Sequence, residues 1–134
     1  MHLHPDDAQA IRQEFERLAN LTPAELRAWL DTPQSRRVGV VRRGETESVG
    51  RQSGRRILEI RATRVADLSD ADYAHMKKVI GFCRRHLAQR PRGDVEHTRW
   101  RWSLMNWGHD PLKTVDPPPQ GEVAKGRRGF PLRS

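Results

Sequence analysis

The chain has 134 residues, of which 35% are hydrophobic and 31% are charged, and its formal net charge is +8. This length leaves room for one domain with a modest core, and no apolar stretch approaches the roughly 20 residues that a membrane-spanning helix needs. Because no export signal is visible and the single cysteine, Cys83, excludes an internal disulfide, we expect a soluble cytoplasmic protein.

The positive charge is distributed unevenly along the chain. Arginine outnumbers lysine by 21 to 4, a bias that a GC-rich genome produces without any selection for binding. Residues 1–34 carry a net charge of −3, whereas residues 35–66 contain nine arginines against three glutamates, a net charge of +6. A concentrated basic segment indicates a polyanionic partner, most plausibly nucleic acid.

The apolar periodicity predicts an all-α fold of about five helices. The first helix is expected over residues 5–18, with proline and acidic residues in its first turn. The second begins after Thr22, which is predicted to be the N-cap. Pro23 then occupies the first helical position, and Glu25 completes a capping box.

Residues 33–47 interrupt the helical pattern with three valines and two glycines. The valines suit a short strand or an extended arm, and the glycines mark turns, so both structures stay open for this connection. These residues are Val38, Val40, Val41, Gly39 and Gly44. A third helix is then predicted over residues 47–61, with Ser48 as its cap and with Arg51 and Arg55 pointing away from the apolar side.

A fourth helix is predicted from Ser69, which forms a capping box with Asp72, to Arg90. A fifth is expected over residues 95–107, with Gly108 as its left-handed cap. Together these elements predict one helical domain over residues 1–113. The remaining residues, 114–134, are rich in proline, glycine and arginine, and we expect them to form a flexible tail.

Four blocks of sequence resemble a known family. They are TPAELRAWL (22–30), ESVGRQSGRRILEI (47–60), DLSDADYAHMKKVIGFCRRHLAQRP (67–91) and TRWRWSLMNWGHDPLK (98–113). Residues 21–113 thereby resemble the bacterial and fungal family described as domain of unknown function 3140, whose members are often labelled DNA-binding proteins. The resemblance implies a small helical DNA-binding protein and supplies no catalytic residue. Arg51 stands where the family usually has a histidine.

The third helix is the predicted binding element, and two interpretations of it stay open. In the functional one, small residues admit a backbone or a phosphate, and neighbouring arginines bind phosphate oxygens or a guanine edge. The small residues are Gly50, Ser53 and Gly54, the arginines are Arg51, Arg55 and Arg56, and Arg36, Arg37, Arg42 and Arg43 form a flanking arm. In the structural interpretation, the glycines admit another helix and the arginines pair with Glu47 and Glu59.

Tryptophans are concentrated near the end of the predicted domain, interleaved with arginines. Trp100, Trp102 and Trp107 suit base stacking, but their helical spacing favours core packing in so small a domain. His75 and His86 lie three turns apart on the fourth helix and are too distant to share a metal ion. We therefore expect no metal, no cofactor and no small-molecule substrate.

These patterns predict a non-enzymatic DNA-binding protein that contacts the phosphate backbone through its basic helix. The alternative is a protein-interaction module, or a homodimer, that uses the same helix against an acidic partner.

Overall fold

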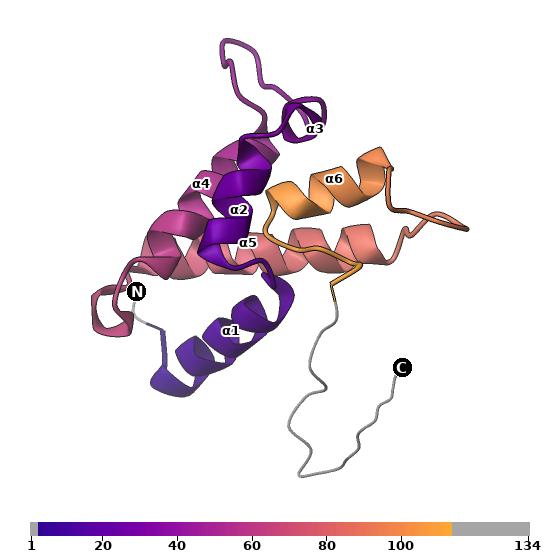
Figure 1. Cartoon of the computed structure of the whole chain (residues 1–134). Helices are drawn as coiled ribbons and strands as arrows, with labels where there is room; N and C mark the ends of the chain where they lie inside the picture. The colour runs from indigo at the N-terminus through magenta and orange to yellow at the C-terminus, as the bar shows by residue number, and fades with distance from the viewer. Residues whose placement is uncertain (1–2, 114–134) are drawn as a thin grey trace.

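This computed structural model describes residues 3–113 of the chain, which contain six α-helices and one 3-10 helix joined by loops (Figure 1). They are α1 (Pro5–Leu18), α2 (Pro23–Leu30), α3 (Pro33–Arg36), α4 (Val49–Arg61), η1 (Val65–Asp67), α5 (Asp70–Leu87) and α6 (Arg99–Asn106). The described residues form no strand, which confirms the all-α prediction. None of their helices has both the length and the apolar character needed to cross a membrane. The tail predicted for residues 114–134 lies outside the described range.

The predicted helix starts are confirmed where a polar side chain caps the first turn. Thr22 and Glu25 form both hydrogen bonds of a capping box at the start of α2, and Ser69 and Asp72 do the same for α5. Ser48 caps α4 by accepting a hydrogen bond from a backbone amide in its first turn. Capping bonds satisfy amides that have no partner within the helix, so these local signals fix where the chain becomes helical.

The interrupted region begins with a short helix that the sequence pattern did not predict. Thr32 accepts a hydrogen bond from the amide of Ser35, and Pro33 occupies the first helical position of α3. This is the same start signal as in α2, but α3 has only four residues and no apolar period of its own.

Two predicted helix boundaries are wrong by a few residues. The last helix, α6, begins at Arg99 rather than at Val95, because Thr98 caps it and Val95 is a buried residue of the preceding turn. Helix α5 ends at Leu87 rather than at Arg90. Both differences lie at helix ends, where the terminal turn frays and the boundary is least sharply defined.

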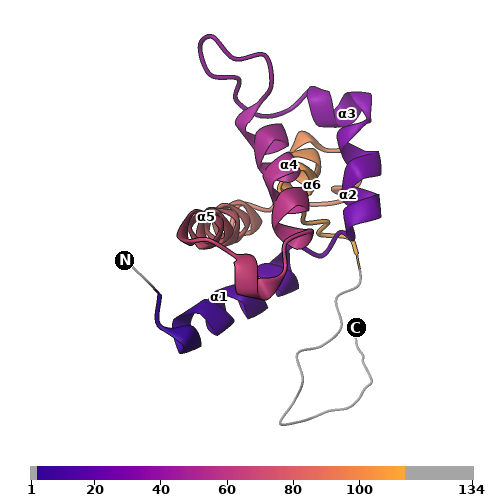
Figure 2. The same ribbon diagram turned by 90° about the vertical axis from the view of Figure 1, so that its left-hand side faces the viewer.

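Helix α4 lies at the centre of the fold, in contact with α2, α5 and α6, while α1 packs along α5 (Figures 1 and 2). Because three helices surround α4, a wide arc of it is buried, not a single apolar stripe. Its buried residues are Gly50, Arg51, Ser53, Gly54, Ile57 and Ile60. The largest fully buried apolar side chains of the core are Leu26, Ile57, Met76, Leu104, Val79 and Val95.

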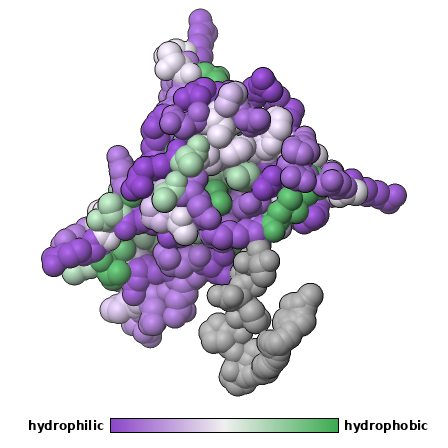
Figure 3. All heavy atoms as spheres, viewed as in Figure 1, coloured by the Kyte–Doolittle hydropathy of each residue, from purple (hydrophilic) through white to green (hydrophobic). Residues whose placement is uncertain are grey.

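Residues 39–48, which we call the arm, project away from the helices in both ribbon views (Figures 1 and 2). At the base of the arm, the amide of Val49 donates a hydrogen bond to the carbonyl of Val40 at 2.8 Å. Near its tip, the amide of Glu45 donates to the carbonyl of Arg42 at 2.9 Å. The connection is thus an extended arm, not a strand, and its tip stands out as a hydrophilic protrusion in Figure 3.

Positive φ angles confirm the turns predicted at glycines. Gly39 (φ 96°) and Gly44 (φ 84°) redirect the chain within the arm, and Gly108 (φ 83°) follows α6. These values lie in the left-handed region, which glycine enters without a steric penalty.

Candidate functional site

Arg51, the first candidate for phosphate binding, lies inside the protein. Its side chain is only 7% exposed. One terminal nitrogen, Nη1, donates hydrogen bonds to the carbonyl of Leu30 and to Oγ of Ser35, and Nη2 lies 3.2 Å from a carboxylate oxygen of Glu47. The expected outward orientation of Arg51 is therefore wrong, because the packing of α4 against α2 encloses this side of the helix.

The guanidinium of Arg51 belongs to a buried polar network that joins four helices. Oγ of Ser35 donates to Oδ1 of Asn106 at 2.5 Å, and Nε1 of Trp29 donates to the same oxygen at 2.8 Å. Nδ2 of Asn106 returns a hydrogen bond to the carbonyl of Ser35 at 3.2 Å. A buried network of this kind is stabilising only while each member keeps its partners. Asn106 was missed by the sequence analysis, because nothing near position 106 signals a partner in α3.

The three small residues predicted to allow a close approach lie against other helices of the fold: Gly50 and Gly54 against the end of α6, and Ser53 against α5. A Cβ atom placed on Gly54 would lie 2.7 Å from the carbonyl oxygen of Asn106, and one on Gly50 would lie 3.1 Å from Nε1 of Trp107. Ser53 is buried as well, with its hydroxyl 2.9 Å from Nε2 of His75. These contacts match the structural interpretation, in which the glycines admit another helix.

The other two arginines of α4 are paired with carboxylates. Arg55 is exposed, and its Nε and Nη2 donate to the carboxylate of Glu47 at 2.9 and 2.7 Å. This hydrogen bonding lowers the pKa of Glu47 below its ordinary value. Arg56 donates to Asp72 at 2.6 Å. A bidentate or short charged pair uses the same donors that a phosphate would need.

Pairing with carboxylates divides the nine arginines of residues 35–66 into two groups. Six lie within ion-pair distance of a carboxylate: Arg36, Arg51, Arg55, Arg56, Arg61 and Arg64. The other three, Arg37, Arg42 and Arg43, are exposed and have no carboxylate partner within the described residues. The pair of Arg36 with Asp31 is long, at 3.6 Å, and both side chains are more than half exposed.

Helix α6 adds an exposed arginine, Arg99, beside Arg37. Nη2 of Arg99 donates a hydrogen bond to the carbonyl of Arg37, although 62 residues separate the two in the sequence. The exposed arginines Arg36, Arg37, Arg42, Arg43 and Arg99 form what we call the arginine surface. Arg99 was not among the predicted binding residues, because no local sequence pattern shows that it lies beside Arg37.

Trp100 of α6 and Trp107, which directly follows this helix, face other aromatic rings. Trp107 is stacked on Phe82, with 4.4 Å between ring centroids and 12° between planes, and also lies parallel to His75. Trp100 lies parallel to His86 at 5.9 Å. These contacts favour the core-packing interpretation, because a ring face that is already stacked is not open to a base. Burial lowers the pKa of both histidines, which favours their neutral forms.

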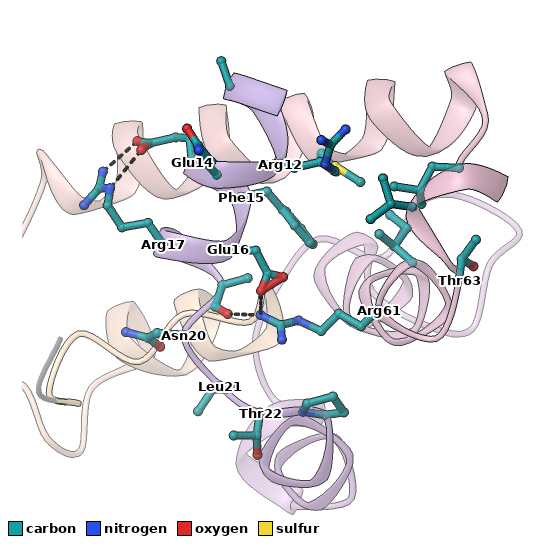
Figure 4. A pocket seen from close by; sticks show the side chains of 18 of the residues that line it. Arg12, Glu14, Phe15, Glu16, Arg17, Asn20, Leu21, Thr22, Arg61 and Thr63 are labelled. Carbon is teal, nitrogen blue, oxygen red and sulfur yellow. Dashed lines mark hydrogen bonds and ion pairs between the residues drawn. The ribbon is translucent and has the colours of Figure 1, made fainter. Parts of the chain in front are cut away.

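A pocket of about 1240 Å³ opens between α1, the start of α2 and the end of α4 (Figure 4). Apolar side chains such as Phe15, Ile60 and Met76 line its interior. Its charged side chains are largely engaged with protein atoms: Arg17 pairs with Glu14 at 2.6 Å, and Arg61 donates to a backbone carbonyl. Arg17 and Arg61 are therefore engaged within the fold.

Other groups with reactive chemistry are isolated or buried. Cys83 is fully buried, and burial raises its pKa to about 12, so its thiol stays protonated at neutral pH. Within residues 3–113, no three side chains of the types that ligate metals come together.

Comparison with known proteins gives one match. No curated protein and no solved structure is significantly similar to the chain. The model of the family described as "Protein of unknown function (DUF3140)" matches residues 14–105, which is more than half of the chain. The match begins within α1 and ends within α6, so it includes the arm and all of the buried network except Asn106. The chain therefore belongs to the DUF3140 family.

Proposed function

We propose that this protein is a cytoplasmic, non-enzymatic DNA-binding protein that contacts the phosphate backbone through its arginine surface. The observation that carries the proposal is the state of Arg37, Arg42 and Arg43, which are exposed and lack a carboxylate partner within the described residues.

An exposed, unpaired guanidinium suits a phosphate better than a paired one. It keeps its full charge and its five donors, whereas a paired arginine must first give up a carboxylate. Arg42 and Arg43 also stand on the projecting arm, where a duplex can approach without meeting the helices. Arg55 and Arg56 add to binding only if they exchange Glu47 and Asp72 for phosphate oxygens.

The alternative, a protein-interaction module or homodimer that uses α4, has less support. That helix would meet an acidic partner through arginines that are already paired, and α6 covers the side of α4 that holds Gly50 and Gly54. The contacts of α4 therefore favour a role inside the fold.

Fluorescence anisotropy with labelled duplex and single-stranded DNA tests the proposal. Replacing Arg42 and Arg43 with glutamine should weaken binding at about 50 mM salt and reduce the slope of log affinity against log salt by about 1.8, because each lost phosphate contact removes about 0.9. The matched control is Lys77→Gln with Lys78→Gln, which removes two exposed cations from α5 that have no carboxylate partner in residues 3–113. This control should keep nearly the wild-type slope.

Two results would overturn the proposal. The first is the absence of binding to any duplex or single strand at low salt. The second is an equal loss in the two double variants, which would assign binding to general charge and not to the arm. For the alternative, a pull-down from nuclease-treated lysate is the discriminating measurement, because a protein partner survives nuclease and a nucleic-acid bridge does not.

A further inference from the structure

The pocket beside α1 combines an apolar interior with an excess of positive charge (Figure 4). Its interior is formed by side chains of the core, among them Phe15, Ile60 and Met76. Val65 of η1 also lines the pocket, and it is 58% exposed. An apolar occupant would therefore cover a valine that the folded chain leaves in contact with water.

Cations outnumber carboxylates among the side chains that line the pocket. The carboxylates are those of Glu14 and Glu16, and the cations are Arg12, Arg17, Arg61 and Lys113. Two of these cations are already paired, Arg17 with Glu14 and Lys113 with Glu25, which lies outside the lining. Positive charge thus remains in the pocket after its ion pairs have formed, and this charge favours an anionic occupant.

Arg12 is the cation of the pocket that keeps donors available. No carboxylate within residues 3–113 lies at ion-pair distance from it, and its Nη1 donates a hydrogen bond to the hydroxyl of Tyr73 at 2.7 Å. A hydroxyl is a neutral acceptor, so the charge of Arg12 is not compensated and its other N–H groups are free to bind. Because Arg12 is half-buried beside apolar side chains, a carboxylate there is screened less than on an open surface.

Arg61 adds to the positive potential from the opposite wall, where it reaches from α4 toward Glu16 of α1 (Figure 4). Its side chain is only 17% exposed, and its guanidinium lies over the ring of Phe15 at 6.0 Å. The contact with Glu16 is long, at 3.6 Å, and Nε of Arg61 is buried without a hydrogen-bond partner among the described residues. The charge of Arg61 is therefore only partly compensated by the fold.

We infer that this pocket binds an organic carboxylate with an apolar body, such as a medium-chain fatty acid. Arg12 receives the carboxylate, and the apolar interior together with Val65 receives the chain. Binding sites for small molecules commonly have this design, in which apolar walls supply the contact area and a few polar groups fix the orientation. A guanidinium suits the task because it can donate two parallel hydrogen bonds to one carboxylate. This site is independent of the proposed DNA contact, since it uses neither the arm nor its arginines.

Isothermal titration calorimetry of the full chain with octanoate, hexanoate and octanol tests the two halves of the site separately. Octanoate should bind more tightly than hexanoate, by up to about fourfold for each buried methylene group. Octanol has the same chain without the charge and should bind about tenfold more weakly than octanoate, because the charged hydrogen bonds to Arg12 are missing.

Arg12→Gln should lower the affinity for octanoate about tenfold and leave the affinity for octanol unchanged, a pattern that general loss of structure does not produce. Arg17→Gln is the matched control, because Arg17 lines the same pocket from the same helix but is already paired with Glu14. It should bind both ligands as the wild type does. Val65→Ser should weaken both ligands about threefold, whereas Val41→Ser, an exposed valine of the arm, should weaken neither.

Three results would overturn the assignment of this site. They are the absence of octanoate binding to the wild-type protein, equal wild-type affinities for octanoate and octanol, and an Arg12→Gln variant that keeps the wild-type affinity for octanoate. An equal loss of both ligands in Arg12→Gln would also count against it, because Arg12 would then support the fold and not the carboxylate. None of these results affects the anisotropy test of DNA binding, so the two proposals fail separately.

Discussion

Gly54 lies directly against the backbone carbonyl of Asn106, so that a Cβ atom at position 54 would stand 2.7 Å from that oxygen. The side chain of Leu30 would be almost as close, at 3.0 Å. Helices α4, α6 and α2 therefore meet at a point where only a hydrogen atom fits. A glycine would weaken an isolated helix, but at position 54 it is required because a larger residue would not fit between these helices.

Gly54→Ala should lower the free energy of unfolding by up to about 2 kcal/mol, measured by urea denaturation. Overpacking against backbone costs about 1–3 kcal/mol, and the gain in helix propensity offsets only about 1 kcal/mol of it. The control is Gly81→Ala in α5, where the nearest atom to an added Cβ is the flexible end of Arg85. That variant should be as stable as the wild type or up to about 1 kcal/mol more stable. A Gly54→Ala protein with undiminished stability would contradict this account of the packing.

Arg51→Ala should destabilise the protein by about 3–5 kcal/mol, because it removes a buried ion pair and leaves polar atoms of Leu30 and Ser35 without a donor. Arg55→Gln is the control from the same helix. It loses an exposed pair with Glu47 and should cost less than about 1 kcal/mol. Chemical denaturation of both variants gives the comparison. A similar loss of stability in Arg51→Ala and Arg55→Gln would contradict the expected difference between a buried and an exposed arginine.

Acid should weaken the fold partly through Glu14. Hydrogen bonds from Arg17 and Arg84 lower the pKa of Glu14 from 4.5 to about 2. Because the folded state holds this carboxyl ionised, its contribution is complete above about pH 4.5 and is lost as the pH falls toward 2. Glu14→Gln should therefore be less stable at pH 7 and should lose less stability between pH 4.5 and pH 2. Denaturation curves at several pH values provide the measurement, and a wild-type pH profile in this variant would refute the assignment.

The shape of the arm should depend on Gly39. An alanine there meets Cβ of Ser48 at 3.0 Å and also adopts a left-handed conformation that costs about 1–2 kcal/mol. Gly44→Ala carries the same conformational cost but meets no atom within 4 Å. Gly39→Ala should thus be the less stable of the two in denaturation and should bind DNA more weakly, since its limbs are forced apart. Equal behaviour of the two variants would show that the contact with Ser48 does not hold the arm.

Much of the helical framework follows from local sequence. The starts of α2, α4 and α5 were predicted from the caps Thr22, Ser48 and Ser69, because capping involves residues only three positions apart. The short helix α3 was missed, since four residues are too few to show a helical period. The start of α6 was placed too early because Val95, which is buried in the core, was taken as part of the apolar side of the helix.

The sequence by itself determined the all-α class, most helix boundaries and the excess of arginine between residues 35 and 66. Only the tertiary structure decided which of those arginines are available to a partner. It turned Arg51 inward, paired Arg56 with Asp72, and brought Arg99 to the carbonyl of Arg37. The physical reason is that the charge of an arginine is a property of its side chain, whereas its exposure and its pairing depend on which carboxylates and carbonyls pack beside it. Those neighbours come from helices distant in the chain.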